Sequence, residues 1–147
     1  MNAAQQAAFE ALAGRVLSTD DLALIDQALT AGRINAIAPV LSAGRSRVGT
    51  VSVGDLASWA AATGMRAAIE DHATNAASPL RSIALALRDV LLGGASGIRL
   101  DLPANAAMLG AWVSAGVLSA ENRNALLALA TTPDPVTDAQ VQAALEA

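Results

Sequence analysis

The residue types that most often carry out chemistry are sparse in this chain, and its single histidine is the first to consider. His72 directly follows Glu70 and Asp71. A metal site on a helix needs ligands three or four residues apart, because only those side chains share a face. Three consecutive side chains fan out around the helix instead. We therefore predict a solvated surface histidine and no metal site.

Other groups with catalytic potential have simpler explanations. The chain has no cysteine and no lysine, which excludes disulfides, thiolate ligands and Ser–Lys dyads. With only one histidine, we expect no familiar nucleophile–base pair. The glycine-rich run at 91–100, "LLGGASGIRL", lacks the Lys-Ser/Thr ending of a phosphate-binding loop and precedes a predicted strand. We therefore expect no catalytic residues, no cofactor and no enzymatic activity.

Two closely spaced arginines, Arg45 and Arg47, offer a different chemistry. All nine basic residues of the chain are arginines, whose guanidinium groups form forked contacts suited to protein interfaces. In the run "GRSRVG" the pair could bind an anion or the acidic patch of a partner. Intramolecular salt bridges, or exposed loop arginines, are the alternative. The net charge of −4 gives no general attraction to nucleic acid or to an anionic membrane, so we expect neither as a partner.

Short helices with small side chains are the elements that must position these residues. Hydrophobic residues make up 54% of the 147 residues, but aromatic residues only 2%. The core is therefore built from Ala, Leu, Val and Ile, and alanine is the best helix former. This length suits one ordinary domain. We predict an all-α fold, a compact bundle of about seven to nine short helices, in a single helical domain over 1–147.

One recurring phrase marks where helices begin. Residues 14–29 and 116–129 share a glycine, Val-Leu, a capping serine, an acidic first turn and an Ala/Leu stripe. A third start has Thr137 as the cap and Gln140 three residues on, which is a capping box. A proline-rich link precedes this cap. We therefore expect a C-terminal helix within 133–147.

Single segments carry further expectations. The first helix either packs on the rest of the chain or forms an N-terminal arm over 1–17. Ser78 is expected to cap a helix that has Pro79 in its first turn and runs to Leu92. The uncharged stretch 103–120 contains Pro, Asn, Ser and Gly, so we interpret it as a buried helix and its turn rather than as a membrane span.

Two segments depart from the helical pattern. Residues 48–53 are β-prone and flanked by glycines, and 98–102 alternate apolar and charged side chains. We predict that they pair as a minor two-stranded β patch. Binding residues concentrate on loops held by rigid scaffolds, so we expect protein contacts at 45–53, at 93–102 and on the exposed face of the C-terminal helix. The individual candidates are Arg45, Arg47, Val51, Arg99 and Asp101.

Two longer stretches carry a family resemblance. They are "AIAPVLSAGRSRVGTVSVGDLASW" at 36–59 and "VSAGVLSAENRNALLALATTPDPVTDAQVQAAL" at 113–145. They resemble small Ala-rich proteins from the structural-gene clusters of tailed bacteriophages, which have an Ala-Gly-Arg-x-Arg-Val phrase, a helical middle and a Pro-Asp-Pro-Val-Thr ending. The resemblance covers the last third of the chain and, more loosely, the middle. That group has no well-defined enzymatic role, so it supplies no catalytic residues.

The resemblance implies a protein of the virion, present in the host cytoplasm during assembly. We expect a non-enzymatic structural or assembly subunit, associated with the tail or neck. Its partners would be other phage structural proteins or further copies of itself as a homo-oligomer. The alternative is a binding module outside the virion, such as a tail assembly chaperone or a host-directed regulator.

Overall fold

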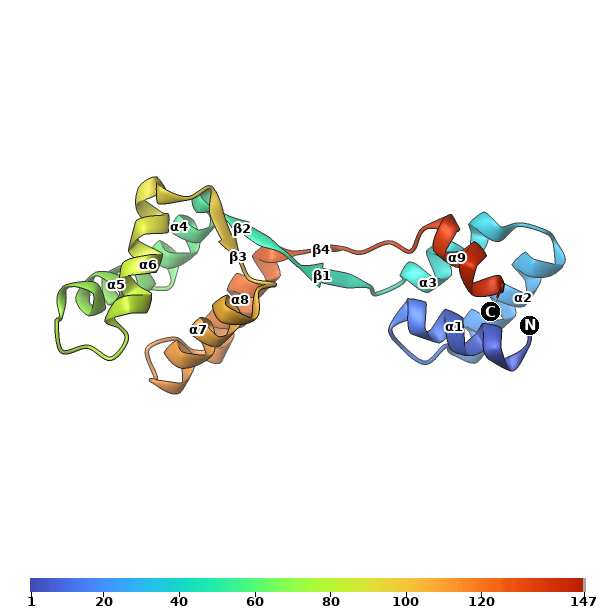
Figure 1. The fold of residues 1–147 in the computed structure, drawn as a ribbon, viewed down its shortest axis with the longest axis horizontal. Helices are drawn as coiled ribbons and strands as arrows, with labels where there is room; N and C mark the ends of the chain where they lie inside the picture. Colours follow the sequence, from blue (N-terminus) through green and yellow to red (C-terminus); the bar gives the residue numbers. More distant parts are fainter. Residues whose placement is uncertain (147) are drawn as a thin grey trace. The chain divides into compact units, whose positions relative to one another are not determined.

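The computed structural model describes residues 1–146 as short helices joined by turns and three-residue strands (Figure 1). The α-helices of this part of the chain are α1 (Ala3–Ala13), α2 (Thr19–Thr30), α3 (Ile37–Ser42), α4 (Val53–Ala62), α5 (Met65–Thr74), α6 (Arg81–Asp89), α7 (Pro103–Ser114), α8 (Ala120–Ala130) and α9 (Asp138–Leu145). A 3-10 turn, η1 (Ile34–Ala36), precedes α3, and a π-helical turn, η2 (Val90–Gly94), follows α6. The strands are β1 (Ser46–Val48), β2 (Thr50–Ser52), β3 (Gly97–Arg99) and β4 (Thr131–Pro133). The predicted all-α fold class is confirmed.

The chain forms two compact units, where the sequence analysis expected a single helical domain. Unit 1 holds residues 1–47 and the chain from 133 onward, and unit 2 holds residues 48–132. Unit 2 is thus inserted into unit 1 between α3 and α9. The physical reason is that the buried apolar side chains divide into two separate clusters, one in each unit.

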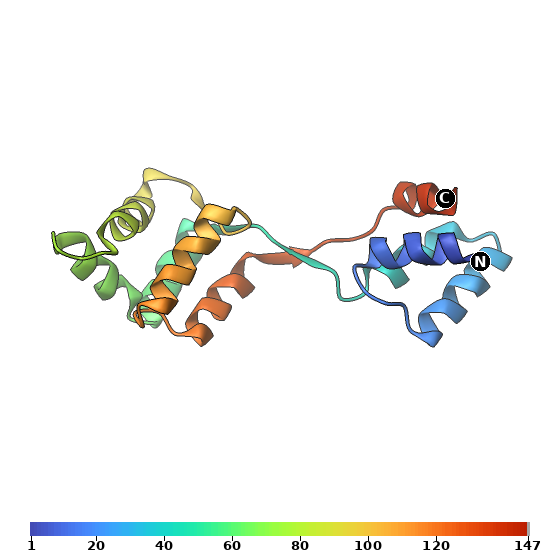
Figure 2. The same ribbon diagram turned by 60° about the horizontal axis from the view of Figure 1, so that its bottom comes forward.

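Unit 1 is built from α1, α2, α3 and α9. Its most deeply buried side chains are Phe9, Ile25, Ile37, Leu41 and Val141, each 0% exposed. The first helix lies beside α9 (Figure 2) and also contacts α3, with Phe9 in the core. Helix α1 therefore packs on the body of unit 1 and is not an arm.

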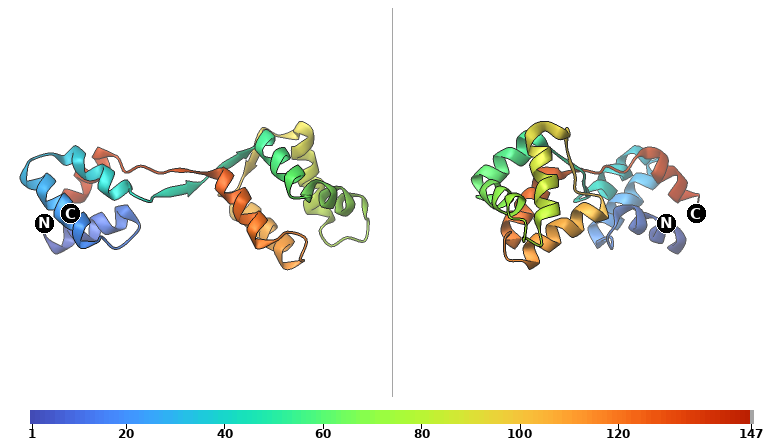
Figure 3. Two further views of the ribbon diagram at one scale, coloured as in Figure 1. Left: turned by 180° about the vertical axis from the view of Figure 1, so that it is seen from behind. Right: turned by 60° about the vertical axis from the view of Figure 1, so that its left-hand side comes forward.

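Unit 2 contains α4 to α8 and one strand pair. Helices α7 and α8 lie side by side (Figure 3), and Trp112 of α7 is 0% exposed. Strand β2 pairs antiparallel with β3, with Val51 opposite Ile98. This pairing confirms the predicted β patch, over 50–52 and 97–99 in place of 48–53 and 98–102. Strands β1 and β4 form a second two-stranded sheet, which was not predicted.

The predicted helix caps are confirmed at three helix starts. Ser18, Ser119 and Thr137 each accept a hydrogen bond from the backbone N–H three residues on. The residue before each cap is apolar and buried, so its packing can fix the angle at which the chain enters the helix. These residues are Leu17, Leu118 and Val136.

The predicted start and end of the helix after Pro79 are wrong. Helix α6 begins at Arg81, and Leu80 at its N-cap gives no side-chain hydrogen bond. The Ser78 hydroxyl instead accepts the Leu80 N–H at 3.2 Å, which closes a turn two residues before the helix. The α-helix ends at Asp89 and continues as η2. No helix within residues 1–146 has the length and apolar content to cross a membrane.

A cavity-creating change should show that the two cores are separate. Phe9→Ala is expected to destabilise unit 1 by about 3–5 kcal/mol, because it empties a fully buried aromatic site. Native-state hydrogen exchange would then show lost protection in α1, α3 and α9. The most protected amides of unit 2 would keep their protection.

The control is Val16→Ala, because the Val16 side chain is 81% exposed. This change should leave the exchange of both units within about 0.5 kcal/mol of the parent protein. An equal loss of protection in the two units of Phe9→Ala would contradict separate cores.

Candidate functional site

A polar cleft of about 400 Å³ lies in unit 1. It is formed between two Ala-Gly-Arg turns, at 13–15 after α1 and at 43–45 after α3. Its glycine and polar lining residues are Gly14, Arg15, Gly44, Arg45, Ser46 and Asp134.

The two turns have the same local construction. Each helix is followed by a glycine in the left-handed conformation, with φ of 65° at Gly14 and 76° at Gly44. Glycine adopts this conformation without the steric cost of a Cβ atom. An arginine then follows directly, beside helix carbonyl groups that have no partner within the helix.

Each arginine caps the helix that precedes the other arginine. Arg15 donates a hydrogen bond from Nη2 to the Val40 carbonyl of α3 at 3.4 Å. Arg45 donates from Nη1 to the Leu12 carbonyl in the last turn of α1. A cation is favoured at a helix C-terminus because the helix dipole is negative there. This crosswise exchange ties the ends of α1 and α3 together.

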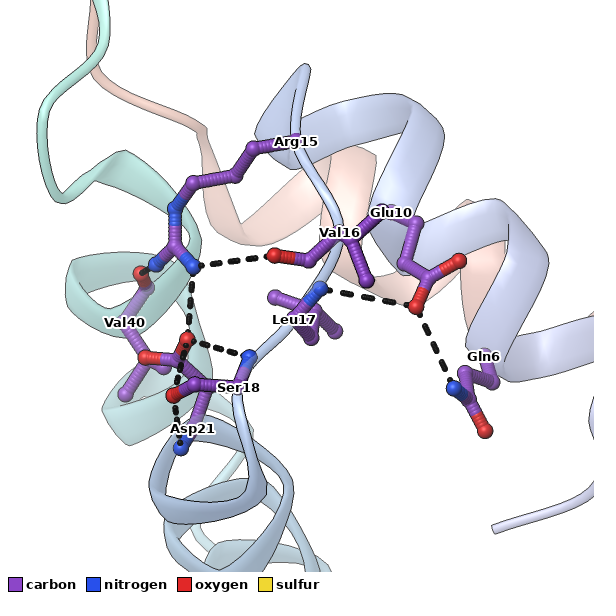
Figure 4. Close-up of polar contacts among 8 residues, drawn as sticks. All are labelled: Gln6, Glu10, Arg15, Val16, Leu17, Ser18, Asp21 and Val40. Atoms are coloured by element: carbon purple, nitrogen blue, oxygen red, sulfur yellow. Dashed lines mark hydrogen bonds and ion pairs between the residues drawn. The ribbon is translucent and has the colours of Figure 1, made fainter.

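Arg15 also connects this pair of helices to α2 (Figure 4). Oδ2 of Asp21 accepts hydrogen bonds from Arg15 Nη1 at 2.6 Å and from the Ser18 backbone N–H at 2.9 Å. The bond from Arg15, with those from Ser18, holds the pKa of the Asp21 carboxyl well below its usual range. The Glu10 carboxylate does not pair with Arg15; its Oε1 accepts a hydrogen bond from the Leu17 N–H at 3.4 Å.

Arg45 makes the second ion pair of the cleft, with Asp134. Its hydrogen bond lowers the pKa of the Asp134 carboxyl, and the charge of Arg47 lowers it further, against the opposing effect of desolvation. Of the two readings of these arginines, the intramolecular salt bridge therefore holds for Arg45. Arg47 is exposed, and its side chain makes no hydrogen bond within residues 1–146.

A second hollow, of about 310 Å³, lies in unit 2 beside β3. We call it the β3 groove. Its walls come from α6 and η2, from β3 and from the start of α7. The apolar side chains that line it are Leu87, Val90, Ile98, Leu102 and Met108.

One wall of the β3 groove is a strand edge. Leu100 donates to the Gly49 carbonyl at 2.8 Å and Val53 donates to the Ser96 carbonyl at 3.3 Å. Because an antiparallel ladder alternates, the backbone groups of Gly97 and Arg99 point away from β2. The Arg99 carbonyl accepts from Asn105 Nδ2 at 2.6 Å.

The predicted contact residues fall in different units. Arg45 and Arg47 belong to unit 1, while Val51, Arg99 and Asp101 belong to unit 2. They therefore do not form one site within a unit.

Val51 is 0% exposed, so its prediction as a contact residue is wrong. Side chains alternate along a strand, and this one points into the core. Arg99 is exposed and donates from Nε to Asp101 Oδ1 at 3.1 Å, at the rim of the β3 groove.

The prediction of a solvated histidine is also wrong. His72 is half-buried, and its ring meets the Trp112 ring edge-on, with 5.4 Å between centroids. Its Nδ1 lies 2.7 Å from the Ser78 hydroxyl oxygen. This is the spacing of a nucleophile–base pair, which the sequence analysis did not expect. The Ser78 hydroxyl also accepts a hydrogen bond from the Leu80 N–H, so the contact between His72 and Ser78 stabilises the turn between α5 and α6.

Arg15, Asp134 and Gly97 were not predicted as site residues from the sequence. Arg15 had a detectable signal, because the phrase Ala-Gly-Arg occurs at 13–15, 31–33 and 43–45. A Cβ atom at Gly97 would lie 2.3 Å from the Val51 carbonyl oxygen. This glycine therefore permits the close approach of β2, a requirement that only the paired structure reveals.

Comparison of the chain with protein-family models, with curated proteins and with solved structures finds no match.

Gly97→Ala is expected to destabilise unit 2 by about 1–3 kcal/mol, because the added methyl group forces β2 and β3 apart. Urea unfolding would measure the change. The matched control is Gly110→Ala, since a Cβ atom there meets nothing within 4 Å and the residue lies inside α7. Alanine is the better helix former, so this control should be neutral or stabilising by up to about 1 kcal/mol. Similar effects of the two changes would contradict the close approach at Gly97.

The ion pairs of the cleft make the stability of unit 1 depend on pH. The folded state lowers the pKa of both Asp21 and Asp134, so each pair contributes stability above the unfolded pKa of about 3.9. That contribution is lost as the pH falls through the lower folded-state values. We expect unit 1 to lose stability progressively below about pH 4.

Asp134→Asn should lower the stability of unit 1 at pH 7 and flatten its acid dependence. Hydrogen exchange of unit 1 amides or thermal unfolding between pH 7 and pH 2 would test this. Asp71→Asn, an exposed carboxylate in α5 of unit 2, is the control and should leave the unit 1 curve unchanged. If the stability of unit 1 in Asp134→Asn fell with decreasing pH as steeply as in the parent protein, this linkage would be ruled out.

Proposed function

We propose that the protein is a non-enzymatic structural or assembly subunit of a tailed-phage virion, associated with the tail or neck. It acts through protein–protein contacts with other phage structural proteins or with further copies of itself. It would be found in the virion, and in the host cytoplasm during assembly. The resemblance of 36–59 and 113–145 to small Ala-rich proteins of phage structural-gene clusters supports the phage assignment.

The observation that carries a contact function is the β3 groove. An extended segment of a partner can add a strand to an open sheet edge and place alternate side chains in adjoining apolar pockets. The β3 groove combines these features: the main-chain groups of Gly97 and the N–H of Arg99 along an edge, and an apolar lining next to them. Gly97, Ile98, Arg99 and Leu102 of its lining belong to 93–102, one of the segments predicted to make contacts.

An exposed apolar side chain in the β3 groove supports this proposal. Leu102 lines the groove and is 40% exposed. Contiguous exposed apolar surface marks interaction sites in proteins.

Leu102→Asp tests the β3 groove without a cost to folding. Leu102 is the N-cap residue of α7 and provides no side-chain cap, while aspartate is a favoured N-cap residue. The variant should therefore be as stable as the parent protein, yet it places a charge in the apolar groove. We expect its incorporation into particles to fall at least tenfold, the effect of about 1.4 kcal/mol of lost binding energy.

The measurement is mass spectrometry of particles purified from the phage that carries this sequence. Val16→Asp, the same charge change at an exposed position of unit 1, is the control and should enter particles normally. Normal incorporation of Leu102→Asp would remove the β3 groove as the contact. Absence of the parent protein from purified particles would contradict a virion subunit and favour an assembly chaperone or a host-directed regulator.

A further inference from the structure

The cleft of unit 1 has properties that the contact function does not use. Arg15, Arg45 and Asp134 line it, Asp21 pairs with Arg15, and the charge of Arg47 acts on Asp134. These three positive and two negative charges leave a local net charge of +1. The whole chain, in contrast, has a net charge of −4. The cleft is therefore a local positive region in an acidic protein.

Arg47 belongs to this region on two grounds. Its charge acts on the Asp134 carboxyl, and Asp134 lines the cleft. It also lies in β1 two residues after Arg45, and side chains two residues apart share a face of an extended chain.

Hydrogen-bond donors remain available in the cleft after the internal contacts are made. A guanidinium group carries five N–H donors and no acceptor. Arg15 and Arg45 use only Nη1 and Nη2 for their contacts within residues 1–146, so their Nε–H groups are not committed to protein acceptors. Arg47 adds a whole guanidinium group. The ligand that matches these donors is an anion with several acceptor oxygens.

The geometry of the cleft also removes the main obstacle to an anion. The helices α1 and α3 both end here, and their C-terminal carbonyl groups repel negative charge. Arg15 and Arg45 donate to carbonyls in those last turns, which cancels the repulsion. The same bonds hold the two half-buried guanidinium groups in place, so binding an anion orders little further structure.

We propose that this cleft, lined by Arg15 and Arg45 with Arg47 directly after its lining residue Ser46, is a binding site for a small oxyanion: a phosphate group or a carboxylate. Its volume of about 400 Å³ is enough for either, together with several water molecules of about 30 Å³ each. The source is a free phosphate compound or the acidic side chain of a partner. This proposal does not depend on the phage function, because it rests on unit 1 alone.

The test is a titration of the full-length, ¹⁵N-labelled protein, followed by amide chemical shifts. Inorganic phosphate is one probe and glutarate, which carries carboxylates, is the other; sodium chloride at equal ionic strength is the reference. We expect saturable shifts at 13–15, 43–47 and Asp134 with at least one probe. Preference for phosphate would indicate a phosphate compound, and preference for glutarate an acidic side chain.

Arg47→Gln and Arg33→Gln form a matched pair of variants. Both arginines are exposed residues of unit 1, but Arg33 belongs to the Ala-Gly-Arg turn after α2, which does not line the cleft. Arg47→Gln should weaken binding roughly three- to tenfold, the effect of losing one partly screened charged contact. Arg33→Gln should leave it unchanged. Shifts no larger than those with chloride, or equal effects of the two variants, would overturn the proposal.

Discussion

The crosswise arginine contacts are the constraint on which unit 1 depends. Arg45 donates to the end of α1, and Arg15 donates to a carbonyl of α3 and pairs with the carboxylate that caps α2. The Asp134 partner of Arg45 fixes the chain just before α9. Together, Arg15 and Arg45 therefore contact an end of α1, of α2 and of α3, and the segment that leads into α9.

These contacts have more effect than isolated surface ion pairs. An exposed salt bridge contributes little, because water screens it and its side chains lose rotational freedom. Here the guanidinium groups are half-buried, and each also donates to one carbonyl in the last turn of a helix, where carbonyl groups lack the full set of helical partners. A helix of six residues such as α3 is marginal by itself, so its ends must be held by the tertiary structure.

Unit 2 depends on close apolar packing instead of on charge. Val51 and Ile98 are directly opposite each other in the β2–β3 pair, and both belong to its core. The strands can approach this closely only because residue 97 is a glycine. Their pairing leaves the outer edge of β3 beside the apolar lining of the β3 groove. The open edge is thus a direct consequence of a patch with only two strands.

Features that depend on nearby residues were predictable, and those that depend on distant partners were not. The caps Ser18, Ser119 and Thr137 act within three residues, so the sequence shows them directly. Arg45 and Asp134 are 89 residues apart, and nothing in the run around Arg45 indicates which carboxylate it meets.

The same limit explains the errors at single residues. His72 is half-buried because Trp112, 40 positions later, packs against its ring. The β-prone pattern of 48–53 correctly predicted a strand. It did not give the face on which Val51 would lie, since that depends on which side of the pair the helices cover. The division into two units likewise follows from which apolar stripes meet, and helix periodicity alone does not specify those partners.

The two hollows, one in each unit, differ in the chemistry of their lining. The cleft is polar and is built from helix ends, so its chemistry is that of fixed charges. The β3 groove is apolar and borders a strand edge, so it suits main-chain pairing with buried side chains. A ligand of one hollow has little complementarity to the other, since the lining of the β3 groove is mostly apolar and an apolar strand in the cleft would leave the guanidinium groups without acceptors. Within one short chain, each unit therefore presents a surface of its own chemistry.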